Sequence, residues 1–444
     1  MNYNKPGLLF IASAFLLLAS CKKDNNGSGS STSADDLVKD SAWMYTQDVY
    51  LWYKTLPTNF NPRSYSDPNA IMEAIRQYSI EPGFTDPVDR WSFGIKKAEW
   101  DDVSSGISGD FGLGIFFNST NDLRVSYVEP ASPAGAAGIT RAWRIVSINN
   151  DTTINTDDAT ITRISTAVYS SSSTSFVFVR PDNTDTSITL TAASYQEQPI
   201  LLDSIYNIGG NKVGYFVYNS FLGNVTAIKS QFNTLFNKFN SEGITDMVVD
   251  LRYNGGGYVE LQNELANYLV PSAGNGGVML QEQFNDKLSA TEDTTINYLK
   301  KGSLNLSRIF FITTKNTASA SELLINSLKP YMDVKLVGKP SHGKPVGFFN
   351  IGVGDWYIFP VSFRSVNKNG EGNYFNGLQP DANVNDGLDK QWGDVEENCL
   401  ASALHYISNG AFSRVSSRVD DLKVESGNTK FDARKFKGAV EKRR

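Results

Sequence analysis

The stretch that most constrains how this chain can fold runs from residue 308 to residue 347. The apolar run at 309–312 predicts a buried strand, and small and hydroxyl residues follow it. Leucines at helical spacing then lead to Pro330, which ends the predicted helix. A strand that turns sharply into a helix can present a serine hydroxyl beside the unpaired N–H groups at the helix start.

A second strand is predicted over 334–338, and the loop 341–345 follows it. Ser319 and Lys344 are therefore expected to meet at the ends of neighbouring strands, as a serine nucleophile and a lysine base. Spacing alone leaves open the alternative that neither residue has a catalytic role, because small-residue turns are common and most lysines in loops are solvated.

Two sequence blocks resemble those of the C-terminal processing (tail-specific) serine peptidases. They are Thr317-Ala-Ser-Ala-Ser-Glu322 and Val337-Gly-Lys-Pro-Ser-His-Gly-Lys344. The resemblance implies that Ser319 is the nucleophile and that Lys344 is its base.

A third block, Asp250-Leu-Arg-Tyr-Asn-Gly-Gly-Gly257, is similar to a glycine loop of the same family. The resemblance implies an oxyanion hole built from the N–H groups of Gly256 and Ala320. Glycine is needed there because a bare backbone can approach the scissile carbonyl. The chain contains no GxGxxG or GxxxxGK[ST] pattern, which argues against nucleotide binding.

The expected fold class is α/β and multidomain, with an N-terminal helical domain, a PDZ-like β domain and an α/β serine peptidase core. The expected boundaries are a lipoprotein signal peptide at 1–20, a flexible tether at 21–34, the helical domain at 35–103, the PDZ-like domain at 104–195, the core at 196–412 and a polar C-terminal tail at 413–444. The tail is expected to be solvated and is assigned no partner.

Short alternating strands and turn residues mark the PDZ-like region. Within it, Gly112-Leu113-Gly114-Ile115 resembles the loop with which PDZ domains bind a peptide's terminal carboxylate through backbone N–H groups. The region departs from the pattern at Ala142-Trp143, where Gly-Asp is usual, so this turn is expected to differ in shape.

The N-terminus has the features of an export signal, with Lys5, an apolar run from Leu8 to Ala19 and small residues after it. Leu-Ala-Ser-Cys21 resembles the bacterial lipoprotein box, in which the cysteine is lipidated; a plain signal peptide is the alternative. We therefore expect a lipid-anchored protein of the bacterial cell envelope, facing the periplasm or the cell surface. Cys399, the other of only two cysteines, is expected to be a buried apolar residue in a closing helix, so no disulfide framework is predicted.

Lysine can act as a base only when it is neutral, and its ordinary pKa is about 10.4. Burial is therefore expected to lower the pKa of Lys344. Many relatives carry a glutamine four residues after the lysine, but this chain has Phe348, which cannot hydrogen-bond the amine. The Ser321 hydroxyl is one candidate to orient Lys344, and His342 is the alternative base; His405 is expected to be structural.

The sequence thus predicts an exported, lipid-anchored serine endopeptidase whose PDZ domain selects protein or peptide substrates by their C-termini. No cofactor or metal is expected. A net charge of −6 argues against nucleic acid as a partner. Two alternatives stay open: a catalytically silent, lipid-anchored PDZ scaffold that binds peptides, and an acyl-transfer hydrolase of non-protein substrates.

The lipoprotein box generates a first prediction. Replacing Cys21→Ser should release the protein from the membrane fraction without unfolding it, because the tether contributes no core residues. Fractionation followed by immunoblotting measures this. Membrane partition of the variant as tight as that of the parent would show that Cys21 is not the anchor.

Overall fold

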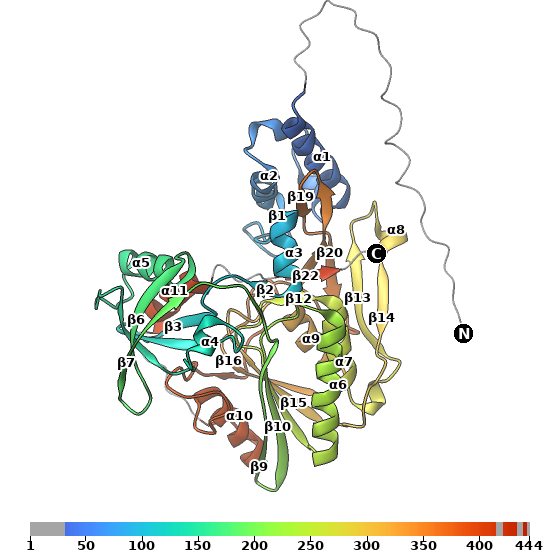
Figure 1. Cartoon of the computed structure of the whole chain (residues 1–444). Coiled ribbons are helices and arrows are strands. Elements are labelled where there is room, and N and C mark those ends of the chain that lie inside the picture. Colours follow the sequence, from blue (N-terminus) through green and yellow to red (C-terminus); the bar gives the residue numbers. More distant parts are fainter. Residues whose placement is uncertain (1–31, 414–420, 433–437, 442–444) are drawn as a thin grey trace, which may run out of the picture.

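The computed structural model describes residues 32–413, 421–432 and 438–441 (Figure 1). The predicted signal peptide, Cys21 and most of the predicted tether lie outside these residues. Within the described ranges, no helix combines the length and the apolar character needed to cross a bilayer.

A six-stranded sheet forms the centre of the core, in the order β21-β16-β15-β11-β10-β9. Its strands are β9 (Ile200–Ile208), β10 (Asn211–Tyr218), β11 (Asp246–Asp250), β15 (Arg308–Thr313), β16 (Asp333–Gly338) and β21 (Ala382–Asn383). All neighbouring pairs are parallel except β9 and β10. The strands predicted at 309–312 and 334–338 correspond to β15 and β16.

Both faces of this sheet are covered, as is usual for parallel strands. Along β15, Ile309 and Phe311 pack into one core cluster, whereas Phe310 and Ile312 pack into another. The two clusters exist because successive side chains of a strand point to opposite faces. Helices α6 (Val225–Glu242), α7 (Val259–Leu269) and α9 (Ala320–Leu328) cover one face, and α10 (Asn398–Asn409) covers the other. Cys399 is buried in α10, as predicted.

A second six-stranded sheet has the order β12-β22-β17-β20-β13-β14. Its strands are β12 (Gly256–Tyr258), β13 (Val278–Phe284), β14 (Thr294–Asn297), β17 (Val346–Phe349), β20 (Phe363–Val366) and β22 (Gly438–Glu441), with α8 (Ser289–Glu292) between β13 and β14. It contains the glycine loop and the segment that follows Lys344.

The N-terminal region is helical only in part. It holds α1 (Ala34–Val49), α2 (Pro68–Ile75), α3 (Lys97–Ser105) and the short 3₁₀ turns Tyr53–Thr55, Pro62–Ser64 and Arg76–Tyr78. The segment β1 (Phe93–Lys96) instead pairs with β19 (Trp356–Phe359), which also pairs with β18 (Ile351–Val353). The region predicted as a helical domain, 35–103, thus also contains a strand that pairs with the core.

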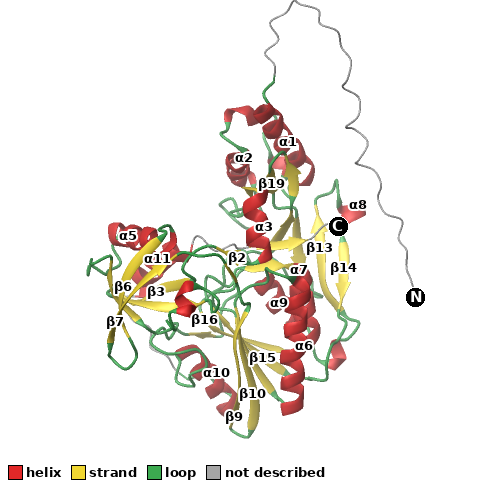
Figure 2. Ribbon diagram, in the orientation of Figure 1, coloured by secondary structure: helices red, strands yellow, loops and turns green. Residues whose placement is uncertain are grey.

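Residues 107–196 form a separate five-stranded sheet in the order β3-β4-β5-β6-β7, seen at the left of Figure 2. Its elements are β3 (Leu113–Ser119), β4 (Asp122–Val128), α4 (Pro133–Ala136), β5 (Arg144–Ile148), α5 (Asp158–Tyr169), β6 (Ser173–Val179) and β7 (Asp185–Thr191), and β2 (Ile107–Ser108) pairs with β8 (Tyr195–Gln196) beside it. We call this part the small sheet unit. Ala142 has φ +74°, a left-handed conformation that explains why glycine is usual at this turn.

A buried ionic cluster attaches the small sheet unit to the core. The Arg141 guanidinium, 2% exposed, contacts Asp386 at 2.5 Å and donates to the Tyr253 hydroxyl at 3.0 Å. Arg252 contacts the same Asp386 and also Glu397. Burial opposes ionisation of Asp386, but the two guanidinium groups outweigh it and lower its pKa to about 2.

The described parts of the C-terminal tail pack on the rest of the protein although Thr429 and Lys430 are exposed, so the expectation of a solvated tail does not hold for its buried residues. Residues Asp421–Asp432 form helix α11, which packs against β3 and α5, and residues 438–441 form strand β22. Phe431 and Val440 are both buried. The polar composition concealed these two anchors because they are the few apolar residues in a charged run.

Candidate active site

The three predicted sequence blocks follow three adjacent parallel strands. The glycine loop follows β11, Ser319 follows β15 and Lys344 follows β16. The carboxyl ends of parallel strands meet at one edge of a sheet, which is where ligands bind in α/β folds. The expectation that Ser319 and Lys344 lie at the ends of neighbouring strands is confirmed.

Ser319 caps the N-terminus of α9 with φ +57° and ψ −107°. A non-glycine residue in this region is strained, by about 1–3 kcal/mol, and persists only where its surroundings enforce it. Such strain at a strand-to-helix turn is the geometry that exposes a nucleophilic serine in other hydrolases.

The Glu322 carboxylate holds the site together. One of its oxygens accepts the backbone N–H of Ser319 at 2.7 Å and that of Lys344 at 2.9 Å. Its other oxygen accepts the Gly343 N–H at 2.6 Å and the Ser341 hydroxyl at 2.5 Å. Burial raises the pKa of Glu322, and these four donors oppose that change. A single carboxylate oxygen therefore brings the backbones of both predicted catalytic residues together.

Lys344 is 1% exposed, and burial lowers its pKa well below the ordinary value of 10.5. Asp89 and Glu322 act in the opposite direction, without outweighing burial. Desolvation thus shifts the pKa of Lys344 in the predicted direction.

Phe348 lies directly against the amine, with Lys344 Nζ 3.7 Å from the ring centroid. Trp91 lies on another side, at 5.6 Å. The aromatic ring of Phe348 therefore packs against the amine and helps to keep water away from it. The Ser321 hydroxyl, which was a candidate to orient the lysine, donates to the Asn254 carbonyl at 3.1 Å.

His342, the alternative base, is engaged elsewhere. Its Nε2 accepts the indole N–H of Trp91 at 2.9 Å, and its backbone N–H donates to Thr317 at 2.9 Å. The lone pair that would abstract a proton is thus already used by Trp91. This arrangement favours Lys344 as the base.

The Ser319 hydroxyl is buried and has no hydrogen-bond partner among the described residues. The hydrogen bond between Ser319 Oγ and Lys344 Nζ is therefore not formed in this conformation. Catalytic hydrogen bonds are often long or misaligned without substrate and tighten when it binds.

Gly256 and Ala320 lie side by side. A Cβ atom built on Gly256, which has φ +102°, would be 3.0 Å from the Ala320 nitrogen and 2.5 Å from the Gly438 carbonyl oxygen. The backbone conformation and the lack of space both require glycine. The Gly256 N–H donates to Asn254 Oδ1 at 2.9 Å, so its role as an oxyanion donor stays a prediction that requires this bond to be exchanged.

The N-terminal region contributes residues that enclose the site, and the sequence did not predict this role for them. Trp91 contacts both His342 and Lys344, and Arg90 donates to the Phe375 carbonyl at 3.3 Å. Asp89 receives the Tyr50 hydroxyl and orders the backbone at Trp91. The aromatic residues of this region indicated a core, and nothing in their spacing pointed to Lys344.

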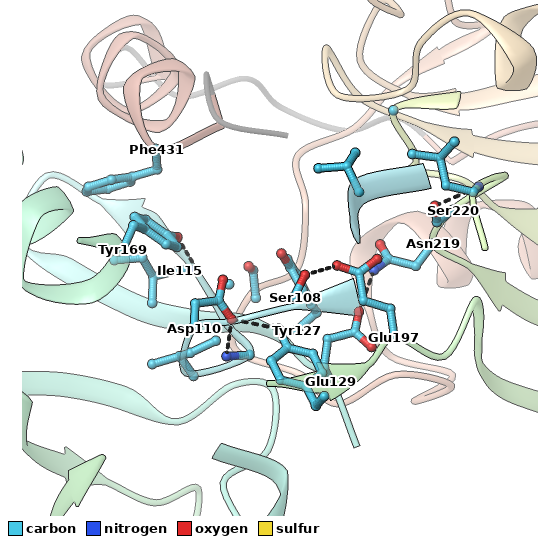
Figure 3. A pocket seen from close by; sticks show the side chains of 18 of the residues that line it. Ser108, Asp110, Ile115, Tyr127, Glu129, Tyr169, Glu197, Asn219, Ser220 and Phe431 are labelled. Carbon is cyan, nitrogen blue, oxygen red and sulfur yellow. Dashed lines mark hydrogen bonds between the residues drawn. The ribbon is translucent and has the colours of Figure 1, made fainter. Parts of the chain in front are cut away.

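The Gly112–Ile115 loop opens onto a cavity of about 210 Å³ that extends to Gly255 and Gly256 (Figure 3). The Gly112 N–H donates to Asp110 at 2.7 Å, and the Ile115 N–H donates to the Tyr169 hydroxyl at 3.2 Å. Glu129 and Glu197 also line the cavity. A peptide carboxylate would have to replace Asp110 and Tyr169 at these two N–H groups.

Comparisons with known proteins agree with this geometry. The family model described as "Peptidase family S41" matches residues 212–384, and the model described as "Peptidase S41 N-terminal domain" matches residues 39–93. The chain is similar to proteins described as CtpA-like serine proteases from Staphylococcus epidermidis (26% identical over 306 residues) and Staphylococcus aureus (22% over 302 residues). Each match covers 66% of this chain, and the chain spans 56% and 55% of the length of these relatives.

A solved structure from Bacteroides fragilis NCTC 9343, described as an S41 protease, has the same fold. The TM-score is 0.68 at 23% identity, over 84% of this chain and 97% of the other. The fold is the α/β fold of this S41 protease, and Ser319 lies at its strained strand-to-helix turn. The chain belongs to peptidase family S41.

The burial of Lys344 generates a second prediction. The folded state disfavours the protonated form of Lys344. Burial of this lysine therefore leaves the free energy of unfolding unreduced above pH 10.5, and reduces it as the pH falls through the lowered pKa. Lys344→Met should therefore raise the melting temperature by several degrees at pH 7, and the gain should shrink as the pH approaches 10.5. Thermal unfolding across pH measures this, with the exposed Lys315→Met as control. A gain independent of pH would contradict a depressed pKa.

Proposed function

We propose that this protein is a serine endopeptidase that hydrolyses peptide bonds with Ser319 as nucleophile and Lys344 as general base. The observation that carries the proposal is the shared Glu322 oxygen, which fixes a strained serine and a desolvated lysine at adjacent strand ends. Burying a lysine is costly because burial penalises its charged form, and this cost supports a functional reason for the burial of Lys344.

The reaction is acyl transfer. Neutral Lys344 Nζ removes the proton from Ser319 Oγ as the oxygen attacks the scissile carbonyl, and the tetrahedral oxyanion is held by the N–H groups of Ala320 and Gly256. The resulting ammonium returns the proton to the leaving amine. Water, activated by the same amine, then hydrolyses the ester of Ser319 and regenerates the enzyme.

Two further elements of the proposal concern location and substrate choice. The Leu18–Cys21 box supports export and lipid anchoring in a bacterial cell envelope. The small sheet unit supports selection by substrate C-termini, as a PDZ-like domain, because its edge strand β3 borders the cavity that leads to Gly256. Peptides bind such edges by adding a strand.

The dyad generates the third prediction. Ser319→Ala and Lys344→Ala should each abolish hydrolysis of an unfolded protein substrate, because nucleophile and base act in one step. His342→Ala should retain most activity. A fluorogenic assay with circular dichroism to verify folding measures this.

Full activity of Lys344→Ala together with loss in His342→Ala would transfer the role of base to His342. No hydrolysis by the folded parent would favour the peptide-binding scaffold, an alternative consistent with the absent bond between Ser319 and Lys344.

Substrate choice generates the fourth prediction. A substrate ending in a free carboxylate should be cut about 10- to 100-fold more efficiently than its C-terminal amide, because a charged hydrogen bond contributes about 1.5–3 kcal/mol. Competition kinetics of the two peptides measure this. Asp110→Asn should enlarge the preference by removing a competing charge at the Gly112 N–H. Equal rates in both proteins would mean that this loop does not bind chain ends.

A further inference from the structure

The chain's own C-terminal strand occupies a gap beside the proposed catalytic residues. Strand β22 lies between β12 and β17 and runs parallel to both. Strand β12 begins at Gly256, and β17 begins two residues after Lys344. The tail thus fills the position that an extended peptide would take between the glycine loop and the lysine segment.

The backbone of β22 reaches the predicted oxyanion residues. The Gly438 N–H donates to the Gly255 carbonyl at 3.1 Å, and Gly438 is paired in register with Gly256. The Gly438 carbonyl oxygen and the Ala320 nitrogen lie 2.5 Å and 3.0 Å from the Cβ position built on Gly256. A carbonyl group of the tail therefore lies against the backbone of Gly256, one of the two predicted oxyanion residues.

One side chain anchors this strand. Val440 is 2% exposed, belongs to the main core cluster and is in register with both Tyr258 and Phe348. Phe348 is the ring against which the Lys344 amine lies. The gap therefore includes an apolar pocket that fits a β-branched side chain two residues after a glycine.

The same tail also covers the open edge of the small sheet unit. The Asn428 carboxamide accepts the Phe117 N–H at 2.7 Å and donates to the Phe117 carbonyl at 3.0 Å, which reproduces the pairing of an added strand. Phe431 stacks on Phe117 with 5.8 Å between ring centroids, and Lys430 contacts Asp158 at 2.5 Å. Edge strands are the usual place for peptide addition.

We propose that residues 421–432 and 438–441 are an internal peptide ligand that competes with substrate at the β3 edge and at the gap between β12 and β17. This proposal rests on the proposed function, because it assigns the gap to substrate binding. It defines the preferred ligand as an extended peptide with a β-branched apolar residue two positions after a small one. Because the tail is tethered, its effective concentration is high, and it raises the apparent KM.

The test compares two full-length variants that add the same charge to the tail. Val440→Asp places a carboxylate in the apolar pocket and should displace β22, whereas Ser413→Asp changes an exposed side chain outside both ligand segments. Val440→Asp should lower KM for a peptide substrate at least tenfold with kcat changed little, and Ser413→Asp should leave both as in the parent. Equal KM values in all three proteins would overturn the proposal.

A binding measurement separates this proposal from the proposed function. In a Ser319→Ala background, a fluorescent peptide of residues 428–444 should bind the Val440→Asp protein at least tenfold more tightly than the protein with the native tail. The same peptide carrying Val440→Asp should not bind. This readout needs no hydrolysis, so it holds even if the dyad is inactive. Val440→Ala, a milder change, should give an intermediate affinity; failure of the native peptide to bind any of these proteins would overturn the proposal.

Discussion

The Glu322 carboxylate is the constraint on which the rest of the site depends. It is buried, and a buried carboxylate is tolerated only when its oxygens accept enough hydrogen bonds. Its four donors come from Ser319 at the start of α9 and from the 341–344 loop after β16. The requirement to satisfy one charge thus fixes the strained turn and the lysine segment relative to each other. Leu378 extends the arrangement by donating its N–H to the Ser341 hydroxyl, so the 377–381 segment is held against the same loop.

The second constraint is the exclusion of water from Lys344. The amine is enclosed by Phe348 from the segment that follows it and by Trp91 from the N-terminal region. Aromatic rings attract a cation through their faces, which favours the protonated form. Burial nevertheless dominates and lowers the pKa of Lys344. Through Trp91, the N-terminal region is therefore part of the enclosure around this amine.

The small sheet unit, the core and the tail are mechanically connected. The Arg252 side chain, in the block that leads to the glycine loop, shares Asp386 with Arg141 of the small sheet unit. Removing one partner from such a buried cluster typically costs about 3–5 kcal/mol, because the remaining charge stays buried. Movement of the small sheet unit would therefore displace Asp386 and change the position of Arg252, which precedes the glycine loop. A ligand at the β3 edge can change the site only to the extent that it binds one arrangement better than another.

The sequence by itself determined the parallel strands and the positions of Ser319, Lys344 and the glycine loop. Apolar runs such as 309–312 predict strands that are buried on both faces of a parallel sheet. The residues that follow such strands then lie together at one edge of the sheet. Gly256 was recognisable from the glycine block that resembles the peptidase family. The structure supplies the reason for glycine, because the conformation and the close contacts of this residue admit no side chain.

Only the tertiary structure decided what surrounds these residues. Trp91 is more than two hundred residues from Lys344, and Asn428 contacts Phe117 across 311 residues. Val440 pairs with Phe348, which lies in a different part of the core sequence. No local periodicity encodes such contacts, because they depend on how whole elements pack. The polar tail shows most clearly what the sequence alone cannot predict. Asn428, Phe431 and Val440 are scattered in a charged run, and their contacts with a strand edge and an apolar gap exist only in the folded protein.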